Sequence, residues 1–398
     1  MLLSAVLGLA IAATLYVLLR ALRAPWTIAA PLTLVGFDAM MPLTTPRPWL
    51  FSMLFFLVQL NIVVSVIRSR MEREASAERL LWLLPPLFIV WANIHVQFII
   101  GLVVLAAAAV DAIWNRQSAG TWILLTVVCA AAALVNPYHV GVYVVARQLM
   151  AQTELWTRIG ELLAPDFRHS TDWIVLAMAL TAAGCIGWQM GSWRRASALR
   201  PPIFLLLLLV LGAYLGFKSR RDTWLTVTAS ACAIAAVRWD TILKRRDALQ
   251  LPGWLATLAT VAMAVLLPLA SLPMLSEETL SANVARTYPS RAAAFVETHG
   301  SPGALYNYFD WGGYLMWRLP QWPVQMDGRT IVHGEPRILA HVDTWQGKAT
   351  WRTDPELAAA SVVIGPRDLP LASLLKLDQR FNLVYEDRDG PAVVFVAK

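Results

Sequence analysis

The sequence predicts an α-helical polytopic membrane protein with an α/β extracytoplasmic domain at its C-terminal end. Hydrophobic residues make up 58% of its 398 residues, and charged residues make up only 15%. Soluble proteins carry about 25% charged residues, so a chain this apolar is typical of an integral membrane protein. The long apolar segments end near Met274, and a soluble composition begins at Leu275. We therefore expect a transmembrane domain over 1–274 and an α/β domain over 275–398.

About ten apolar segments follow one another in the first domain. They are expected at 2–22, 26–45, 48–67, 80–93, 96–114, 121–137, 173–193, 203–217, 223–237 and 254–274. A helix needs ~20 apolar residues to cross the ~30 Å of hydrocarbon in a bilayer. The segments 80–93, 121–137, 203–217 and 223–237 are shorter, and we expect them to be tilted, paired or broken helices.

The basic residues of the short loops predict the sidedness, because Lys and Arg are favoured on the cytoplasmic side. One set of alternate loops carries fourteen of them and the other set carries seven. The richer set includes the Lys244–Arg246 run before the last segment, so residues 275–398 are expected outside, in the periplasm of a bacterium. Ten crossings also place Met1 outside, although no basic residue precedes the first segment. We therefore expect a missing upstream segment or a non-standard start.

The net charge of +7 belongs to these membrane-adjacent loops. Residues 275–398 carry 12 basic and 14 acidic residues, and the first domain carries the other 21 basic and 12 acidic residues. No nucleic-acid surface is therefore expected, and membrane lipids are the expected partners. Three cysteines, all in apolar segments, form no CxxC pattern, and no His or Cys stands at ligand spacing from another. The sequence does not support a divalent metal site, and it indicates no cofactor.

Several outward basic residues go against the usual charge bias. Lys218, Arg220 and Arg221 cluster in "GFKSRRDTW", and Arg47 lies in another outward loop. These four are candidates for holding a lipid phosphate through charge-assisted hydrogen bonds. The alternative is that they anchor to lipid headgroups or pair with acids such as Asp222.

Polar side chains also lie within the apolar segments. Asp38 is a candidate catalytic base in a membrane cavity, and the alternative is a structural ion pair with Arg47. Asn93, His95 and Gln97, in "WANIHVQF", predict a helix break or a polar cavity. They either satisfy freed backbone groups or, in the case of His95, contact a ligand. Tyr138, in "LVNPYHVGVY", is a further polar candidate for this cavity.

The C-terminal domain alternates strand and helix patterns. Strands are expected at 303–308, 323–327, 361–365, 381–386 and 391–397, and helices at 289–300, 312–318, 335–345 and 370–379. Four polar residues of its loops are candidates for an acceptor or partner surface: Asp310, Asp327, Arg329 and His333. The alternative is turn chemistry with a surface ion pair.

Five stretches resemble a group of bacterial multi-span proteins. They are "TTPRPWLFSMLFFLVQL", "LLWLLPPLFIVWANIHVQFIIGL", "LVNPYHVGVY", "NYFDWGGYLMWRLP" and "VQMDGR", in that order. They are similar to the GT-C superfamily of glycosyltransferases, including its family-39-like and lipopolysaccharide-core relatives. The pattern departs after His95, where the family usually has glycines and this chain has Val96 and Gln97.

The resemblance implies an enzyme that takes a sugar from a polyprenyl-phosphate carrier and transfers it, with inversion, outside the membrane. A carboxylate would act as base on the acceptor, and basic residues would hold the departing phosphate. The family's catalytic carboxylate, in its first outward loop, matches no residue of this chain. The alternative is therefore a catalytically degenerate relative that serves as a scaffold or assembly partner in a membrane complex. A secondary transporter is disfavoured because no internal repeat is seen.

Overall fold

The computed structural model divides the chain into two compact units, Met1–Thr260 and Val261–Lys398. The structure describes residues 2–72, 75–196, 203–239, 276–300 and 303–398. The expected boundary at residues 274 and 275 and the expected apolar segment 254–274 lie outside these ranges, as do Lys244–Arg246.

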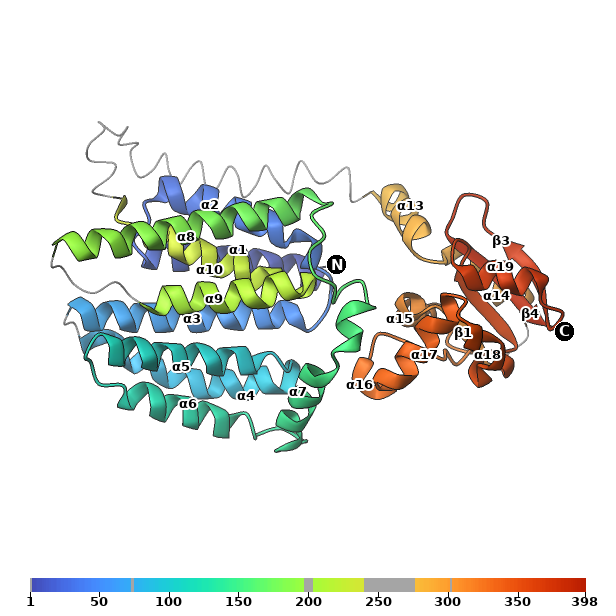
Figure 1. The fold of residues 1–398 in the computed structure, drawn as a ribbon, viewed down its shortest axis with the longest axis horizontal. Helices are drawn as coiled ribbons and strands as arrows, with labels where there is room; N and C mark the ends of the chain where they lie inside the picture. The colour runs from blue at the N-terminus through green and yellow to red at the C-terminus, as the bar shows by residue number, and fades with distance from the viewer. Residues whose placement is uncertain (1, 73–74, 197–202, 240–275, 301–302) are drawn as a thin grey trace. The chain divides into compact units, whose positions relative to one another are not determined.

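Unit 1 is a bundle of α-helices that alternate in direction (Figure 1). Its connections at one end, residues 41–48, 95–97, 133–169 and 219–222, are here called the loop end, and contacts given below join them. The helices are α1 (Leu2–Ala21), α2 (Trp26–Met40), α3 (Trp49–Glu72), α4 (Leu84–Ile94), α5 (Phe98–Trp114), α6 (Gly120–Ala132), α7 (Gly141–Ala151), α8 (Ser170–Ala196), α9 (Ile203–Lys218) and α10 (Thr223–Ala235). Short 3-10 helices are η1 (Met41–Leu43), η2 (Ala75–Leu83), η3 (Glu154–Thr157) and η4 (Arg220–Asp222).

Among the described residues of unit 1, five stretches are long and apolar enough to cross a membrane. They are Leu2–Ala21, Trp26–Leu43, Trp49–Met71, Ala77–Ile94 and Ser170–Gly191, and Phe98–Trp114, Gly120–Ala132 and Ile203–Lys218 are shorter apolar helices. The expectation of a helical membrane protein agrees with these stretches. Nine of the ten expected segments coincide with described helices, and the number of crossings stays a prediction.

Helix α10 forms the centre of the bundle, where every one of its 13 residues is buried. It contacts α9, α8, α2 and α1. At 1.5 Å per residue it is ~20 Å long, which is shorter than the hydrocarbon layer. Glycines allow its closest approach to α9: a Cβ atom at Gly212 would lie 2.7 Å from the Leu225 carbonyl oxygen. The Thr226 hydroxyl donates to the Gly212 carbonyl oxygen at 2.7 Å, which ties the two helices together.

Unit 2 is a three-layer α/β fold around a four-stranded sheet with the order β1-β2-β4-β3. The strands are β1 (Leu305–Asn307), β2 (Val362–Pro366), β3 (Phe381–Glu386) and β4 (Ala392–Ala397). β1 pairs parallel with β2, and the other neighbours pair antiparallel. The helices are α13 (Glu277–Thr287), α14 (Ser290–His299), α15 (Gly312–Arg318), α16 (Thr330–His333), α17 (Glu335–Trp345), α18 (Pro355–Ala358) and α19 (Pro370–Leu377), with η6 (Phe309–Trp311) and η7 (Ala349–Thr353).

Alternate residues of the sheet enter two separate cores, as the pleat of a strand requires. Val362 and Ile364 pack with α14 and α15 on one face. Val363 packs with α17 and α19 on the other face. The expected strand 323–327 is wrong: Val324 forms only an isolated bridge with Leu305.

The side chain of Asn307 explains why no strand forms there. Its Oδ1 accepts hydrogen bonds from the backbone N–H groups of Gln325 (3.0 Å) and Met326 (3.3 Å). Its Nδ2 donates to the Met326 carbonyl oxygen at 2.7 Å. Gln325 N–H also donates to the Leu305 carbonyl oxygen at 3.1 Å within the isolated bridge. Beyond that bridge, both backbone groups of Met326 bond to a side chain instead of continuing a ladder.

Candidate functional site

A cavity of about 490 Å³ opens at the loop end of unit 1. It brings together three of the four predicted phosphate-binding residues, Arg47, Arg220 and Arg221. Its other lining residues come from η1 and its flanks, from the segment before α8, and from α8 and α10: Ala39, Pro42, Leu43, Thr45, Trp49, Glu161, His169, Ser170, Thr171, Asp172, Val175 and Thr223. The cavity thus has an apolar wall beside a cluster of cations and acids.

Two of the three arginines are held by carboxylates of the segment before α8 and of the first turn of α8. Arg47 pairs with Glu161 and lies over the Trp49 ring, with 4.7 Å from its guanidinium carbon to the ring centroid. Arg220 donates to Asp172 at 2.9 Å and also pairs with Asp166. These long-range pairs fasten three connections of the loop end to one another.

Arg221 is the third arginine of the cavity, and its charge acts on the neighbouring buried Asp222 carboxylate. Its backbone N–H donates to the Glu161 carbonyl oxygen at 3.2 Å, which fixes where the side chain starts. Within the part of the chain that the structure describes, its guanidinium forms no ion pair, and its buried Nε has no acceptor. A buried donor without an acceptor is costly, so this guanidinium is suited to an anionic ligand.

Lys218 is the one predicted phosphate-binding residue that does not line the cavity. Its ammonium nitrogen lies 4.5 Å from the centroid of the Trp156 ring and 6.0 Å from that of Tyr214. These cation–π contacts attach the end of α9 to η3. Anchoring of Lys218 to lipid headgroups stays a prediction.

The expected pairing of Asp38 with Arg47 is wrong, since Arg47 pairs with Glu161. Asp38 is exposed on α2 and does not line the cavity, although its neighbour Ala39 does. Successive residues of an α-helix point about 100° apart, so the wall that contains Ala39 excludes Asp38. The structure gives no support to Asp38 as a base in this cavity.

The polar residues of "WANIHVQF" hold helices together at the loop end. Asn93 donates to the carbonyl oxygens of Ile89 (2.8 Å) and Val135 (2.7 Å), which joins α4 to the end of α6. His95 lies in extended backbone after α4, and its Nδ1 is 2.7 Å from the Ser52 hydroxyl of α3. Gln97 donates to the buried Asp222 carboxylate at 2.7 Å. The helix break was predicted correctly, and for Asn93 the contacts agree with the structural alternative.

Tyr138 does not fit the prediction of a cavity residue. Its side chain is 77% exposed, and it is absent from the lining of the cavity. Its backbone N–H donates to Asn136 Oδ1 at 2.7 Å within the turn that follows α6. A Pro137-containing turn places the ring outward, as is common for an interfacial tyrosine.

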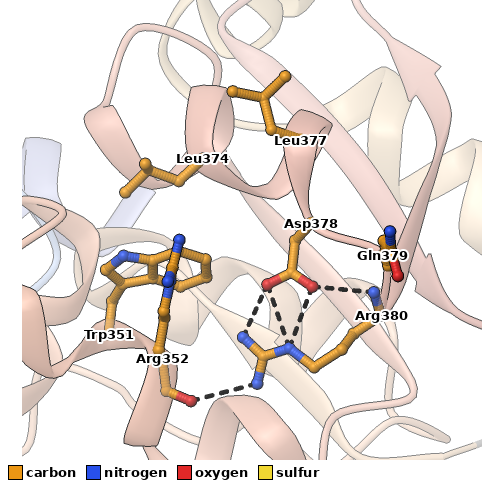
Figure 2. Close-up of a pocket in the computed structure, with 7 residues that line it drawn as sticks. All are labelled: Trp351, Arg352, Leu374, Leu377, Asp378, Gln379 and Arg380. Atoms are coloured by element: carbon orange, nitrogen blue, oxygen red, sulfur yellow. Dashed lines mark hydrogen bonds and ion pairs between the residues drawn. The ribbon is translucent and has the colours of Figure 1, made fainter.

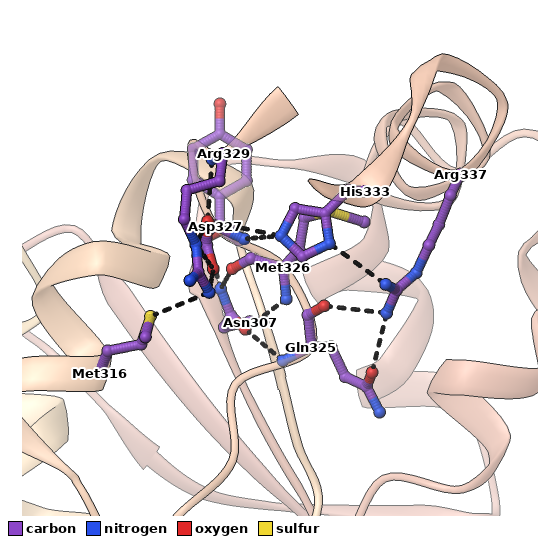
Figure 3. Close-up of polar contacts among 9 residues, drawn as sticks. Asn307, Met316, Gln325, Met326, Asp327, Arg329, His333 and Arg337 are labelled. Carbon is purple, nitrogen blue, oxygen red and sulfur yellow. Dashed lines mark hydrogen bonds and ion pairs between the residues drawn. The ribbon is translucent and has the colours of Figure 1, made fainter. Parts of the chain in front are cut away.

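Three of the four acceptor-surface candidates of unit 2 come together beside α16 (Figure 3). Arg329 holds Asp327 with its Nε (2.9 Å), its Nη2 (2.6 Å) and its backbone N–H (2.8 Å). His333 Nε2 lies 3.4 Å from Asp327 Oδ1. These hydrogen bonds from Arg329 hold the pKa of Asp327 at about 2. The cluster is a network of satisfied pairs, as the turn-chemistry alternative predicts.

The predicted fourth member, Asp310, interacts elsewhere, with Tyr308. Burial and a hydrogen bond to the Asp310 carboxylate raise the pKa of Tyr308 to about 12. Instead, Arg337 of α17 joins the cluster, 3.1 Å from His333 Nδ1 and 2.6 Å from Glu356. Gly312 lets α15 approach it, because a Cβ atom there would lie 2.0 Å from the Met326 carbonyl oxygen. The two quoted motifs of unit 2 therefore meet in space.

A second hollow, of about 500 Å³, lies on unit 2 and was not predicted (Figure 2). Trp351, Arg352, Leu374 and Leu377 line it, together with residues 378–380. Asp378 holds Arg380 in the same Asp-x-Arg turn that joins Asp327 to Arg329. The Asp-x-Arg spacing was therefore the feature of the sequence that could have pointed to this hollow.

In unit 1, the prediction missed Glu161 and Asp172 as cavity residues. The sequence did show several acidic residues just before the apolar segment 173–193. Hydropathy alone, however, cannot show which basic residue each of these acids pairs with. Within the described ranges, no group of three or more His, Cys, Asp and Glu side chains is placed to hold a metal ion. No protein-family model and no curated protein matches this chain.

Proposed function

We propose that the loop-end cavity binds the phosphate of a polyprenyl-linked sugar. The protein would then act as a GT-C-like glycosyltransferase of the bacterial inner membrane, with the cavity and unit 2 on the periplasmic side. The observation that carries this proposal is the convergence of Arg47, Arg220 and Arg221 on one cavity at the end of an apolar helix bundle. The resemblance to GT-C proteins supplies the reaction class.

The cavity offers what a lipid phosphate requires. Guanidinium groups bind phosphate oxygens through paired, charge-assisted hydrogen bonds. Arg221 forms no ion pair among the described residues, although its charge acts on the buried Asp222, and a ligand could supply the acceptor that its Nε lacks. Ala39, Leu43 and Val175 add apolar surface to the lining, which suits the first carbons of a lipid chain.

Transfer would also need a base for the acceptor hydroxyl. In an inverting transfer, the acceptor oxygen forms a bond to the anomeric carbon while the bond from that carbon to the phosphate oxygen breaks. The electron pair of the broken bond leaves with the phosphate, and the acceptor proton passes to the base. Glu161 and Asp172 line the cavity, so they replace Asp38 as the carboxylates to test.

A scaffold that binds lipid without transferring sugar is the second candidate. It is favoured because Glu161 and Asp172 are both engaged by arginines, Arg47 and Arg220. A carboxylate held by a guanidinium is a weaker base than a free one. The two candidates share the phosphate site and differ only in the chemistry that follows binding.

A binding measurement on the full chain in lipid nanodiscs tests the shared site. The probes are a polyprenyl phosphate and the matching polyprenol, which lacks the phosphate. The Arg221→Gln variant should bind the phosphate at least about tenfold more weakly, because a hydrogen bond to a charged group contributes about 1.5–3 kcal/mol. Arg147→Gln, which changes a basic residue of α7 outside the cavity lining, is the matched control and should bind as the parent does. Equal binding of both probes by the parent would refute the site.

A transfer assay then separates enzyme from scaffold. Purified protein is incubated with a polyprenyl-phosphate sugar and candidate acceptors, and the released polyprenyl phosphate is measured. Glu161→Gln and Asp172→Asn should lower release by the ~10²-fold or more that is typical of losing a base, if either is the base. Phosphate-dependent binding without release would favour the scaffold.

A further inference from the structure

Four apolar side chains of unit 2 are exposed on two neighbouring helices. Trp317 is 75% exposed and Val332 is 67% exposed, and Met316 and Ile331 are also exposed. Arg329, the residue before α16, has its Nη2 4.0 Å from the Met316 sulfur of α15, so the start of α16 lies beside α15 (Figure 3). We call Met316, Trp317, Ile331 and Val332 the α15–α16 face. A cluster of this kind, unlike a single exposed leucine, indicates an interaction surface.

The orientation of α15 is fixed by the rest of unit 2. Its opposite side enters the core through Trp311, Leu315 and Leu319. Gly312 packs against the backbone of Met326 and Asp327, so the start of the helix cannot rotate. Met316 and Trp317 therefore cannot turn inward without unpacking that core, and their exposure is a built feature of the fold.

The chemistry of the face matches the boundary of a lipid bilayer. Tryptophan and aliphatic side chains flanked by arginine are typical of segments that lie in the membrane interface. Arg318 and Arg329 flank the face, each held in place by a carboxylate, Glu297 and Asp327. Unit 2 is also joined through residues 240–275 to a unit with candidate membrane spans, so a bilayer is always at high effective concentration.

We propose that the α15–α16 face binds the surface of the lipid bilayer, with Trp317 among the headgroups and Ile331 and Val332 at the acyl boundary. This docking would hold unit 2 against the membrane in which unit 1 is embedded. It does not depend on the identity of any sugar or acceptor, and it would hold for an enzyme and for a scaffold.

Fluorescence quenching by spin-labelled lipids tests the docking in the full chain. Cys129, Cys185 and Cys232 are first replaced by alanine, and a single cysteine at Val332→Cys carries an environment-sensitive dye. The control label is at Val384→Cys, which is also exposed and lies in β3, the edge strand opposite β1. In nanodiscs whose lipids carry a nitroxide near the headgroup, the dye at 332 should be quenched and its emission blue-shifted. The dye at 384 should show neither effect.

A second variant pair shows whether the face causes the quenching. Trp317→Glu with Ile331→Glu should remove more than half of the quenching at 332, whereas Leu383→Glu should not change it. Circular dichroism and thermal unfolding confirm that each variant is folded. Quenching at 332 no stronger than at 384 overturns the proposal. A dye at 332 that is shielded from aqueous iodide, yet not quenched by the lipids, also overturns it and indicates a protein partner instead.

Discussion

Two Asp-x-Arg turns fix arginines of unit 2 in the same way. Arg329 and Arg380 each donate from the backbone and from the guanidinium to the aspartate two residues earlier. The Asp327 side chain is 4% exposed and also lies beside His333, whereas the Asp378 side chain is 13% exposed. The same local pattern is therefore embedded more deeply at Asp327.

The first prediction is that Asp327→Asn destabilises unit 2 by about 1–3 kcal/mol, because a charge-assisted pair is lost and Arg329 remains. Asp378→Asn, the matched control, should cost less because its pair is more exposed. Hydrogen exchange of the β1 and β2 amides in the full chain measures both. Equal losses would show that the embedding of Asp327 adds nothing.

The acid response of the same residue has a defined sign. The pKa of Asp327 is about 2 in the folded chain, below its unfolded value of roughly 4. Its contribution is therefore complete above pH ~4 and is lost as the pH falls toward ~2. In Asp327→Asn this part of the acid destabilisation should be absent.

The second prediction concerns His341, which is buried in the core between the sheet and α17. Its Nε2 accepts a hydrogen bond from Trp345 Nε1 at 3.1 Å, and burial lowers its pKa to about 4. The unfolded chain binds a proton below pH ~6.5 that the folded chain does not, so stability should fall between pH ~6.5 and ~4. His341→Gln should flatten this pH dependence by up to ~1.4 kcal/mol per pH unit. An unchanged slope, measured by hydrogen exchange corrected for intrinsic rates, would contradict this assignment.

The residue types, more than their partners, were accessible from sequence. The excess of outward arginines predicted a cationic site, and the structure gathers three of those residues in one cavity. Their acids, Glu161 and Asp172, come from a segment more than a hundred residues from Arg47, and only tertiary folding selects them. The prediction that Asp38 lies in the cavity failed because the sequence alone does not show toward which side of the bundle a polar residue of an apolar helix points.

At the scale of elements, the contact of α9 with α10 depends on two glycines. A Cβ atom at Gly216 would lie 2.1 Å from the Thr226 hydroxyl oxygen, and one at Gly212 would also clash. Small residues of this kind let membrane helices approach closely and form hydrogen bonds between backbones and hydroxyls. A larger side chain at Gly212 or Gly216 would therefore push α9 and α10 apart.

The third prediction is that Gly212→Val destabilises unit 1 by about 1–3 kcal/mol through overpacking. Gly184→Val is the matched control, because Gly184 also lies inside an apolar helix but a Cβ atom there meets no atom within 4 Å. Both variants carry the same helix-propensity cost, so their difference isolates the packing. The midpoint of thermal unfolding in detergent, monitored through the thiol labelling of Cys232 as it becomes exposed, is compared between the two variants. Similar midpoints for both variants would refute the packing argument.

The bounds of helices were predicted well where glycine or proline residues mark their ends. The expected bounds 312–318 and 335–345 match α15 and α17, which begin at glycines or beside a proline. The helix α13 was missed because none of its residues is buried, so its sequence has no continuous apolar face that would predict a helix.

For the whole molecule, the fourth prediction concerns sidedness. The loop bias of fourteen to seven basic residues predicts that residues 275–398 lie outside the cytoplasm. Alkaline phosphatase fused after Lys398 should be active, and a cytoplasm-only fluorescent reporter at the same place should be dark. A fusion after Arg116, in a connection of the opposite end, should give the reverse result. A fluorescent fusion at Lys398 would overturn the sidedness of both candidate sites.

At this scale, hydropathy predicted a helical membrane unit followed by an α/β unit, because apolar content and strand alternation are local properties. It could not predict which helix is central. The "TVTASACAIAA" stretch is less apolar than its neighbours, and it lies at the centre because small residues allow four helices to surround it. The number of crossings depends on residues 240–275 as well, which lie outside the described ranges.

The central place of α10 has a consequence for the order of synthesis. Its partners α1, α2, α8 and α9 all precede it in the chain, so each leaves the ribosome before the helix that completes their packing. A nascent chain that ends at Asp222 would present an unfilled groove to the lipid or to an insertion chaperone. We expect such a truncated chain to be degraded much faster in cells than one that ends at Trp239, and pulse–chase half-lives would show this. Maturation of the bundle would then wait for its innermost helix, which is made after the four helices that surround it.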